Sequence, residues 1–156
     1  MSDAAKKTAA TPGLGTTLAS IVNGCFGDYL SQRDNGLAID MAFYRNNRPL
    51  PLTPETLREA FPAPTSKLCV LVHGLCCHEG AWDYPDNPAR SYGSALQDDL
   101  GYTPFFLRYN TGLPIPYNGT ALDALLEKLL AAYPLDVEEL VLVGHSMGGL
   151  VLRGAC

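Results

Sequence analysis

The fold is decided by one stretch of the sequence, LVLVGHSMGG at residues 140–149. Its first four residues form an apolar run, which is typical of a strand buried on both faces of a parallel sheet. A glycine-rich turn follows at once, and the apolar residues 150–152 then continue in a pattern that favours a helix. The stretch therefore predicts a buried strand that turns sharply into a helix.

The turn contains the pattern Gly-x-Ser-x-Gly, with Ser146 between Gly144 and Gly148. A strand that enters a helix through so tight a turn crowds its apex, and glycine removes the Cβ atoms that would collide there. The serine at the apex is expected to adopt a strained conformation with its hydroxyl exposed. Since the N-terminus of the following helix attracts negative charge, the site favours an oxyanion, and Ser146 is a candidate nucleophile.

A second element, VHGL at residues 72–75, ends an earlier buried strand. A serine nucleophile in acyl transfer needs two N–H donors aimed at the oxygen on which negative charge develops. Met147, which directly follows the nucleophile, is expected to supply one donor. The backbone N–H of Leu75 is the candidate for the other, because Gly74 would let this loop approach the site closely.

Together these residues resemble a known family. LVHGL at 71–75, Trp82 and VGHSMGG at 143–149 match, in order, the pattern of the lipase and esterase branch of the α/β-hydrolases. Within that branch, the sequence is most similar to the lipase-like group related to GPI inositol-deacylases, over residues 67–155. The resemblance implies an α/β-hydrolase fold with a doubly wound, mainly parallel sheet. It also implies Ser146 as nucleophile and the amides of Leu75 and Met147 as the oxyanion hole.

The activity expected from this resemblance is hydrolysis of carboxylic esters through an acyl-enzyme on Ser146, with a small-molecule or lipid ester as substrate. A thioesterase, an amidase and an acyltransferase use the same turn and remain alternatives. So does a non-catalytic binding module with the same fold. Leu113, Ile115 and Tyr117, in the predicted loop over 110–119, are candidates to line an acyl pocket, and plain loop packing explains them equally well.

The sequence departs from the family pattern after the nucleophile. In this fold the catalytic acid and histidine follow the serine, whereas residues 147–156 contain neither. The three histidines lie upstream of Ser146. His73 is expected to orient the loop that carries Leu75, and His145 should point away from the hydroxyl. His78 lies on a predicted flexible loop that could approach the site, so it stays an alternative as base. We therefore expect a fold truncated just after the nucleophile turn and nearly inactive alone. The strand over 140–143 would then form an exposed edge that favours self-association.

The rest of the chain divides into three parts. Residues 1–13 are predicted to form a disordered tail, 14–36 an amphipathic helix, and 37–156 a partial α/β-hydrolase domain. Within the last part the pattern predicts a hairpin over 39–52, helices over 53–61, 91–100 and 120–133, and strands over 67–73, 105–107 and 140–143.

The composition argues against several classes of ligand and predicts where the protein is located. The net charge of −5, with no cluster of basic residues, argues against nucleic-acid binding. The five cysteines lack a disulfide or metal-site spacing, and no motif for a cofactor or metal is present, so we expect neither group. Free thiols and the lack of a long apolar run predict a cytoplasmic protein. A lipoprotein or secreted form is the alternative, and contact with a membrane surface is left open.

Overall fold

The computed structural model describes residues 18, 21 and 39–156. The predicted tail over 1–13 lies outside these residues. So does the predicted helix over 14–36, apart from Leu18 and Ile21, which are helical and exposed. The elements are β1 (Ala42–Arg45), β2 (Arg48–Pro49), α2 (Pro54–Ala60), β3 (Lys67–Val72), the 3₁₀ turn η1 (Glu79–Trp82), β4 (Asp83–Tyr84), β5 (Asn87–Ser91), α3 (Tyr92–Leu100), β6 (Thr103–Arg108), α4 (Ile115–Ala132), β7 (Glu139–Gly144) and α5 (Met147–Ala155).

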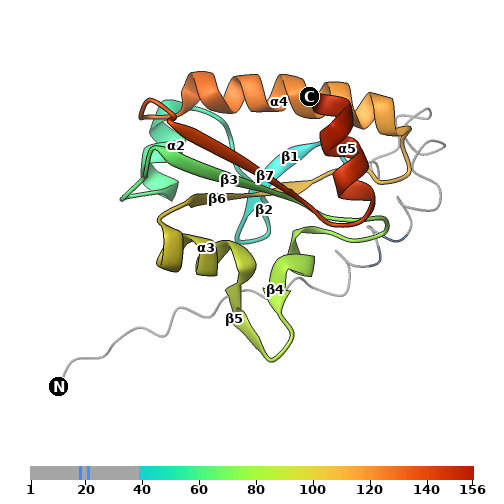
Figure 1. Ribbon diagram of the computed structural model, residues 1–156, viewed down its shortest axis with the longest axis horizontal. Coiled ribbons are helices and arrows are strands. Elements are labelled where there is room, and N and C mark those ends of the chain that lie inside the picture. The colour runs from blue at the N-terminus through green and yellow to red at the C-terminus, as the bar shows by residue number, and fades with distance from the viewer. Residues whose placement is uncertain (1–17, 19–20, 22–38) are drawn as a thin grey trace.

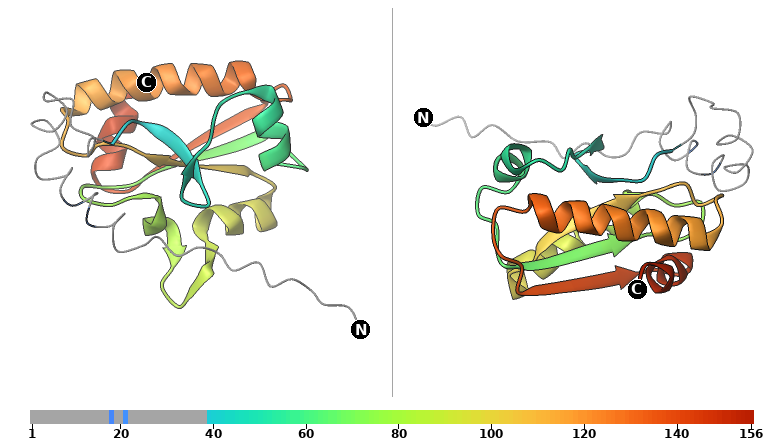
Figure 2. Two further views of the ribbon diagram at one scale, coloured as in Figure 1. Left: turned by 180° about the vertical axis from the view of Figure 1, so that it is seen from behind. Right: turned by 90° about the horizontal axis from the view of Figure 1, so that it is seen from above.

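A five-stranded sheet in the order β2-β1-β6-β3-β7 forms the centre of the molecule. Strand β3 pairs in parallel with both β6 and β7, whereas β1 pairs antiparallel with β6 and β2. Figure 2 shows β7 at one margin of the sheet and β1 with β2 at the other. The mainly parallel sheet agrees with the predicted fold class.

Helices cover both faces of this sheet, as the doubly wound prediction requires. Figure 1 shows α4 and α5 on one side and α3 on the other. Alternation along β3 explains the two layers, because Val70 faces the core under α4 while Cys69 and Leu71 pack with Trp82 on the α3 side. Residues 68–72 are all fully buried, which accounts for the continuous apolar run in the sequence.

Several helix ends follow from their local sequence. Thr53 caps α2 by accepting a hydrogen bond from the Thr56 N–H, and Pro54 occupies the first turn. Gly101 ends α3 in the left-handed conformation with φ 74°. These two helices confirm the predicted spans over 53–61 and 91–100 closely.

The predicted loop over 110–119 is wrong in its second half. Helix α4 begins at Ile115, so Ile115 and Tyr117 belong to its first turn, and Tyr117 is exposed. Pro116 does not prevent this, because the first N–H groups of a helix need no intrahelical acceptor. The small β4–β5 sheet was not predicted either.

No helix in the described part of the chain is long and apolar enough to cross a membrane.

Candidate active site

Ser146 lies at the apex of the turn between β7 and α5, and it is exposed. Its backbone has φ 52° and ψ −122°, a conformation that residues with a Cβ rarely adopt. Such a conformation costs about 1–3 kcal/mol and persists only where its surroundings enforce it. Here two short hydrogen-bonded turns do so: the Gly148 N–H donates to His145 O at 2.9 Å, and the Gly149 N–H donates to Ser146 O at 3.0 Å.

The two glycines that flank Ser146 are required by close backbone contacts. A Cβ on Gly148 would lie 2.7 Å from His73 O and closer still to Val72 O. A Cβ on Gly144 would lie 2.7 Å from the nitrogen of Gly149. The structure therefore confirms that glycine is needed at both positions of the turn, and it shows that α5 starts in direct contact with the end of β3.

The loop after β3 packs against the same turn. A Cβ on Gly74 would lie 3.2 Å from Ser146 Cβ and 3.1 Å from His145 Nδ1, which is tighter than ordinary van der Waals contact. The register continues this proximity, because Val72 pairs with Gly144 and Val72 O accepts a hydrogen bond of 3.0 Å from the His145 N–H. The fold thus brings the loop that carries Leu75 next to Ser146.

Two backbone N–H groups at this turn are not engaged. Neither the Leu75 N–H nor the Met147 N–H donates a hydrogen bond to another described residue. Met147 is the first residue of α5, so its N–H has no acceptor inside the helix and lies at the positive end of the helix dipole. Neither N–H group is thus occupied by an acceptor in the described part of the chain.

His73 holds the peptide that joins Gly74 to Leu75. Its Nδ1 lies 2.9 Å from Gly74 O, and the peptide that carries this carbonyl also carries the Leu75 N–H. The Cys77 N–H donates to the same oxygen at 3.3 Å. Since a carbonyl only accepts, Nδ1 must hold the imidazole proton. The carbonyl and the N–H of one peptide point in opposite directions, so fixing the first fixes the second. The expectation that His73 orients this loop by hydrogen bonding is confirmed.

Burial lowers the pKa of His73 to about 4, and its Nε2 has no hydrogen-bond partner among the described residues. In the unfolded chain the pKa of a histidine is near 6.5, so the native state resists protonation. We therefore expect stability to be complete above pH 6.5 and to fall as the pH drops toward 4, by about 3 kcal/mol from His73 alone. Urea unfolding of the protein and of a His73→Gln variant across this range measures the effect. Equal slopes in the two proteins would contradict it.

The other two histidines are not placed as a base for Ser146. His78 caps η1, because its Nδ1 accepts a hydrogen bond of 3.0 Å from the Gly80 N–H. Burial lowers the pKa of His78 as well. His145 is exposed, with Nδ1 beside Gly74. Among the described residues, no hydrogen bond joins a histidine to Ser146 Oγ.

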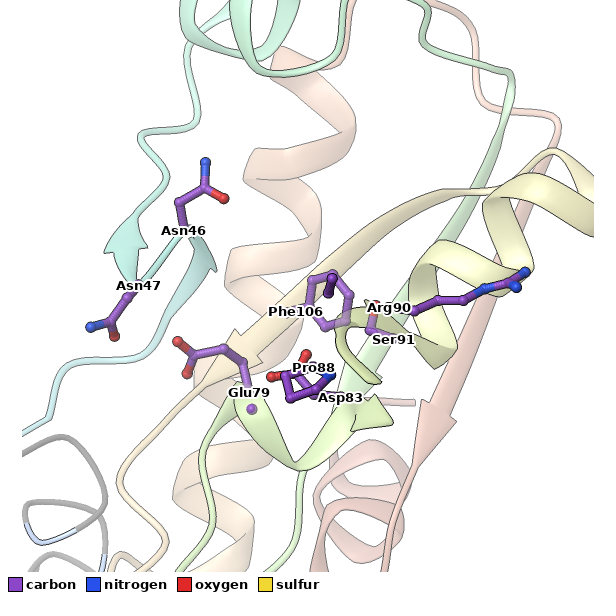
Figure 3. Close-up of a pocket in the computed structure, with 10 residues that line it drawn as sticks. Asn46, Asn47, Glu79, Asp83, Pro88, Arg90, Ser91 and Phe106 are labelled. Carbon is purple, nitrogen blue, oxygen red and sulfur yellow. The ribbon is translucent and has the colours of Figure 1, made fainter. Parts of the chain in front are cut away.

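A cavity of about 190 Å³ lies next to the β4–β5 hairpin and is also lined by Glu79 and Gly80 of η1. Figure 3 shows the Glu79 carboxylate there, directed toward Asn47, with Asp83 beside it and Arg90 extending away. Burial and the nearby Glu79 raise the pKa of Asp83. Ser146, Leu75 and Met147 do not line this cavity. No group of three or more potential metal ligands occurs in the residues that the structure describes.

Sequence reasoning missed three residues that contact the loop over 73–79. Arg108, Tyr109 and Thr111 lie at and just beyond the end of β6, and Arg108 contacts Glu79 at the end of the loop. A signal was available in their position, since ligand sites of open parallel sheets form at the carboxyl ends of the strands. Their partners could not be read from the sequence because the contacts span 29 to 36 residues.

Comparison with known proteins agrees with this geometry. The model of the alpha/beta hydrolase family matches residues 69–156, which include most of β3, the loop after it, β7 and the Ser146 turn. Searches of the curated proteins and of the solved structures returned no match. The chain belongs to the alpha/beta hydrolase family.

Proposed function

We propose that the protein is a serine hydrolase of the lipase and esterase branch of its family, and that it cleaves carboxylic esters through an acyl-enzyme on Ser146. The observation that carries the proposal is the strained, exposed Ser146 with two unengaged N–H groups beside it. Backbone strain of this kind clusters at functional sites, where it holds a reacting group in place.

In the proposed reaction, Ser146 Oγ forms a bond to the carbonyl carbon of the ester while its proton passes to a general base. None of the three histidines of the chain is placed for this role, so the reaction of the chain alone is expected to be slow. The carbonyl oxygen becomes an oxyanion and accepts hydrogen bonds from the N–H groups of Leu75 and Met147. The bond between the carbonyl carbon and the alcohol oxygen then breaks, and the alcohol leaves with a proton. Water adds to the acyl-enzyme in the same way and releases the carboxylic acid and the serine hydroxyl.

An apolar acyl group is the substrate class that the surroundings favour. Leu75 follows Gly74, which touches the Ser146 turn, and 53% of its surface is exposed. Leu150, in the first turns of α5, is 50% exposed. Burying these two side chains against an acyl chain would contribute about 25 cal/mol for each square ångström of apolar surface removed from water.

A fluorophosphonate probe tests this proposal, because it phosphonylates a serine that acts as a nucleophile, with loss of fluoride. We expect the probe to label Ser146 slowly, because no histidine of the chain is placed as its base, and mass spectrometry of the labelled peptide locates the label. The label should disappear in Ser146→Ala, since no other hydroxyl-bearing residue in the described part of the chain has a positive φ.

Ser66→Ala is the matched control. The Ser66 hydroxyl donates a hydrogen bond to Glu138 at the opposite end of β3 from the Ser146 turn, so its loss should not affect labelling. Labelling that survives in Ser146→Ala would contradict the proposal, because another residue would then be the nucleophile. A parent protein that takes no label would contradict it as well and would favour a binding module. Reactions with the oxygen ester, thioester and amide of one acyl group then separate the enzyme classes. The oxygen ester is expected to react fastest relative to its uncatalysed rate.

A further inference from the structure

The residues that end β6 lie alongside the residues that end β3. The two strands are parallel neighbours, with Val72 opposite Leu107 in the register. The chain beyond each strand therefore emerges at the same edge of the sheet, and the segment 108–111 runs beside the loop over 73–79. We call this loop the oxyanion loop, because it carries the Leu75 donor of the proposed reaction.

Tyr109 contacts the start of the oxyanion loop. Its hydroxyl donates a hydrogen bond of 2.8 Å to His73 O, and its ring stacks on the His73 ring with the centroids 4.6 Å apart. Both side chains are almost completely buried. Burial also raises the pKa of Tyr109, so the hydroxyl keeps the proton that it donates. His73, which fixes the Gly74–Leu75 peptide, is thus itself held in place by Tyr109.

Thr111 contacts the middle of the loop. Its Oγ1 accepts a hydrogen bond of 3.1 Å from the Cys76 N–H, and Thr111 is buried. Cys76 has φ 57°, a left-handed conformation that is strained for a residue with a Cβ. The bond from Thr111 holds Cys76 in that conformation. Leu75 therefore lies between the Gly74–Leu75 peptide, which His73 holds, and the Leu75–Cys76 peptide, which Thr111 holds.

Arg108 contacts the end of the loop. Its Nε donates to Glu79 Oε2 at 2.6 Å, and its Nη2 donates to Glu79 Oε1 and, at 2.5 Å, to Asn47 Oδ1. The segment 108–111 is anchored in turn by α4, since Asn118 Nδ2 donates to Asn110 O at 2.9 Å. The loop is thus supported at its beginning, middle and end by one short segment.

We infer that Tyr109 and Thr111 are positioning residues for the oxyanion donor: together they hold the oxyanion loop so that the Leu75 N–H stays directed at the Ser146 turn. This inference rests on the proposed function, in which that N–H stabilises the oxyanion. Thr111 acts through Cys76 and Tyr109 through His73, and neither touches the substrate.

Thr111→Val and Thr111→Ser test the inference, because valine keeps the shape of threonine and loses its hydroxyl, whereas serine keeps the hydroxyl. We expect Thr111→Val to slow phosphonylation of Ser146 by roughly tenfold, less than the factor of about 10²–10³ that follows from removing an oxyanion donor. Amide hydrogen exchange in residues 75–77 should become faster in the same variant, since the Cys76 N–H loses its acceptor. Thr111→Ser should behave like the parent protein in both measurements.

The outcomes separate this inference from the proposed function. If the parent protein labels at Ser146 and Thr111→Val labels equally fast, the inference is overturned and the proposed function stands. Equal slowing in the valine and serine variants also overturns it, because the hydroxyl would then be irrelevant. If the parent protein takes no label, the proposed function fails. Hydrogen exchange alone then decides whether Thr111 supports the loop. Unchanged exchange in Thr111→Val then overturns the support role of Thr111.

Discussion

Gly148→Ala is expected to destabilise the protein by about 3 kcal/mol and to abolish labelling of Ser146. A methyl group at this position would lie 2.7 Å from His73 O and still closer to Val72 O. Both obstacles are backbone atoms at the end of the buried strand β3, so neither can rotate away. The start of α5 must therefore shift, and the strained Ser146 apex shifts with it. Thermal unfolding should show a melting temperature lowered by roughly 10 °C.

The neighbouring residue supplies a matched control. A Cβ on Gly149 meets nothing within 4 Å, although Gly149 lies in the same first turn of α5. Alanine favours a helix over glycine by about 1 kcal/mol, so Gly149→Ala should be neutral or slightly stabilising. Equal stabilities for the two alanine variants would show that α5 does not contact β3 as described.

Arg108→Ala is expected to cost about 3–5 kcal/mol, because it leaves the carboxylate of Glu79 buried without its partner. Only 11% of the Arg108 side chain and 13% of the Glu79 side chain are exposed. The guanidinium also lies over the ring of Tyr44, with Cζ 3.8 Å from the centroid, and this contact is lost as well. Urea unfolding at pH 7 measures the change.

The exposed ion pair between Arg90 and Asp98 serves as the comparison for the buried pair. Arg90 lies 3.8 Å from Asp98, and both side chains are largely exposed, so Arg90→Ala should change stability by less than about 1 kcal/mol. A double variant, Arg108→Met with Glu79→Met, removes both charges and should recover part of the loss. If Arg108→Ala is as mild as Arg90→Ala, the buried pair does not hold the oxyanion loop.

The parts of the site that depend on local sequence could be predicted. The run over 140–149 indicated a strand, a turn and a helix, and β7, Ser146 and α5 follow in that order. The crowding that requires Gly144 and Gly148 is a property of any sharp strand-to-helix turn, so the pattern alone was sufficient. His73 was also interpreted correctly, because its acceptor, Gly74 O, is the next residue in the chain.

The parts that depend on tertiary contacts could not. Pro114 and Pro116 suggested a loop, whereas buried Asn118 and Gly119 fix the start of α4 against Asn110 and Gly154. A Cβ on Gly119 would lie 2.6 Å from the backbone of Gly154, so the two helices meet there by backbone contact. Gly119 and Gly154 are far apart in the sequence, so this contact could not be read from it. The same holds for Thr111 and Cys76, which are 35 residues apart.

The parallel pairing of β3 with β7 sets the distance between the two proposed oxyanion donors. Six residue pairs, from Lys67 opposite Glu139 to Val72 opposite Gly144, fix this register. One residue of slippage would displace Leu75 relative to Met147 by about 3.3 Å, more than the length of a hydrogen bond. A deletion inside either strand should therefore prevent the two N–H groups from binding the same oxyanion. The segment that joins the strands can change in length at its surface turns, such as Pro85–Asp86, and leave the donors where they are.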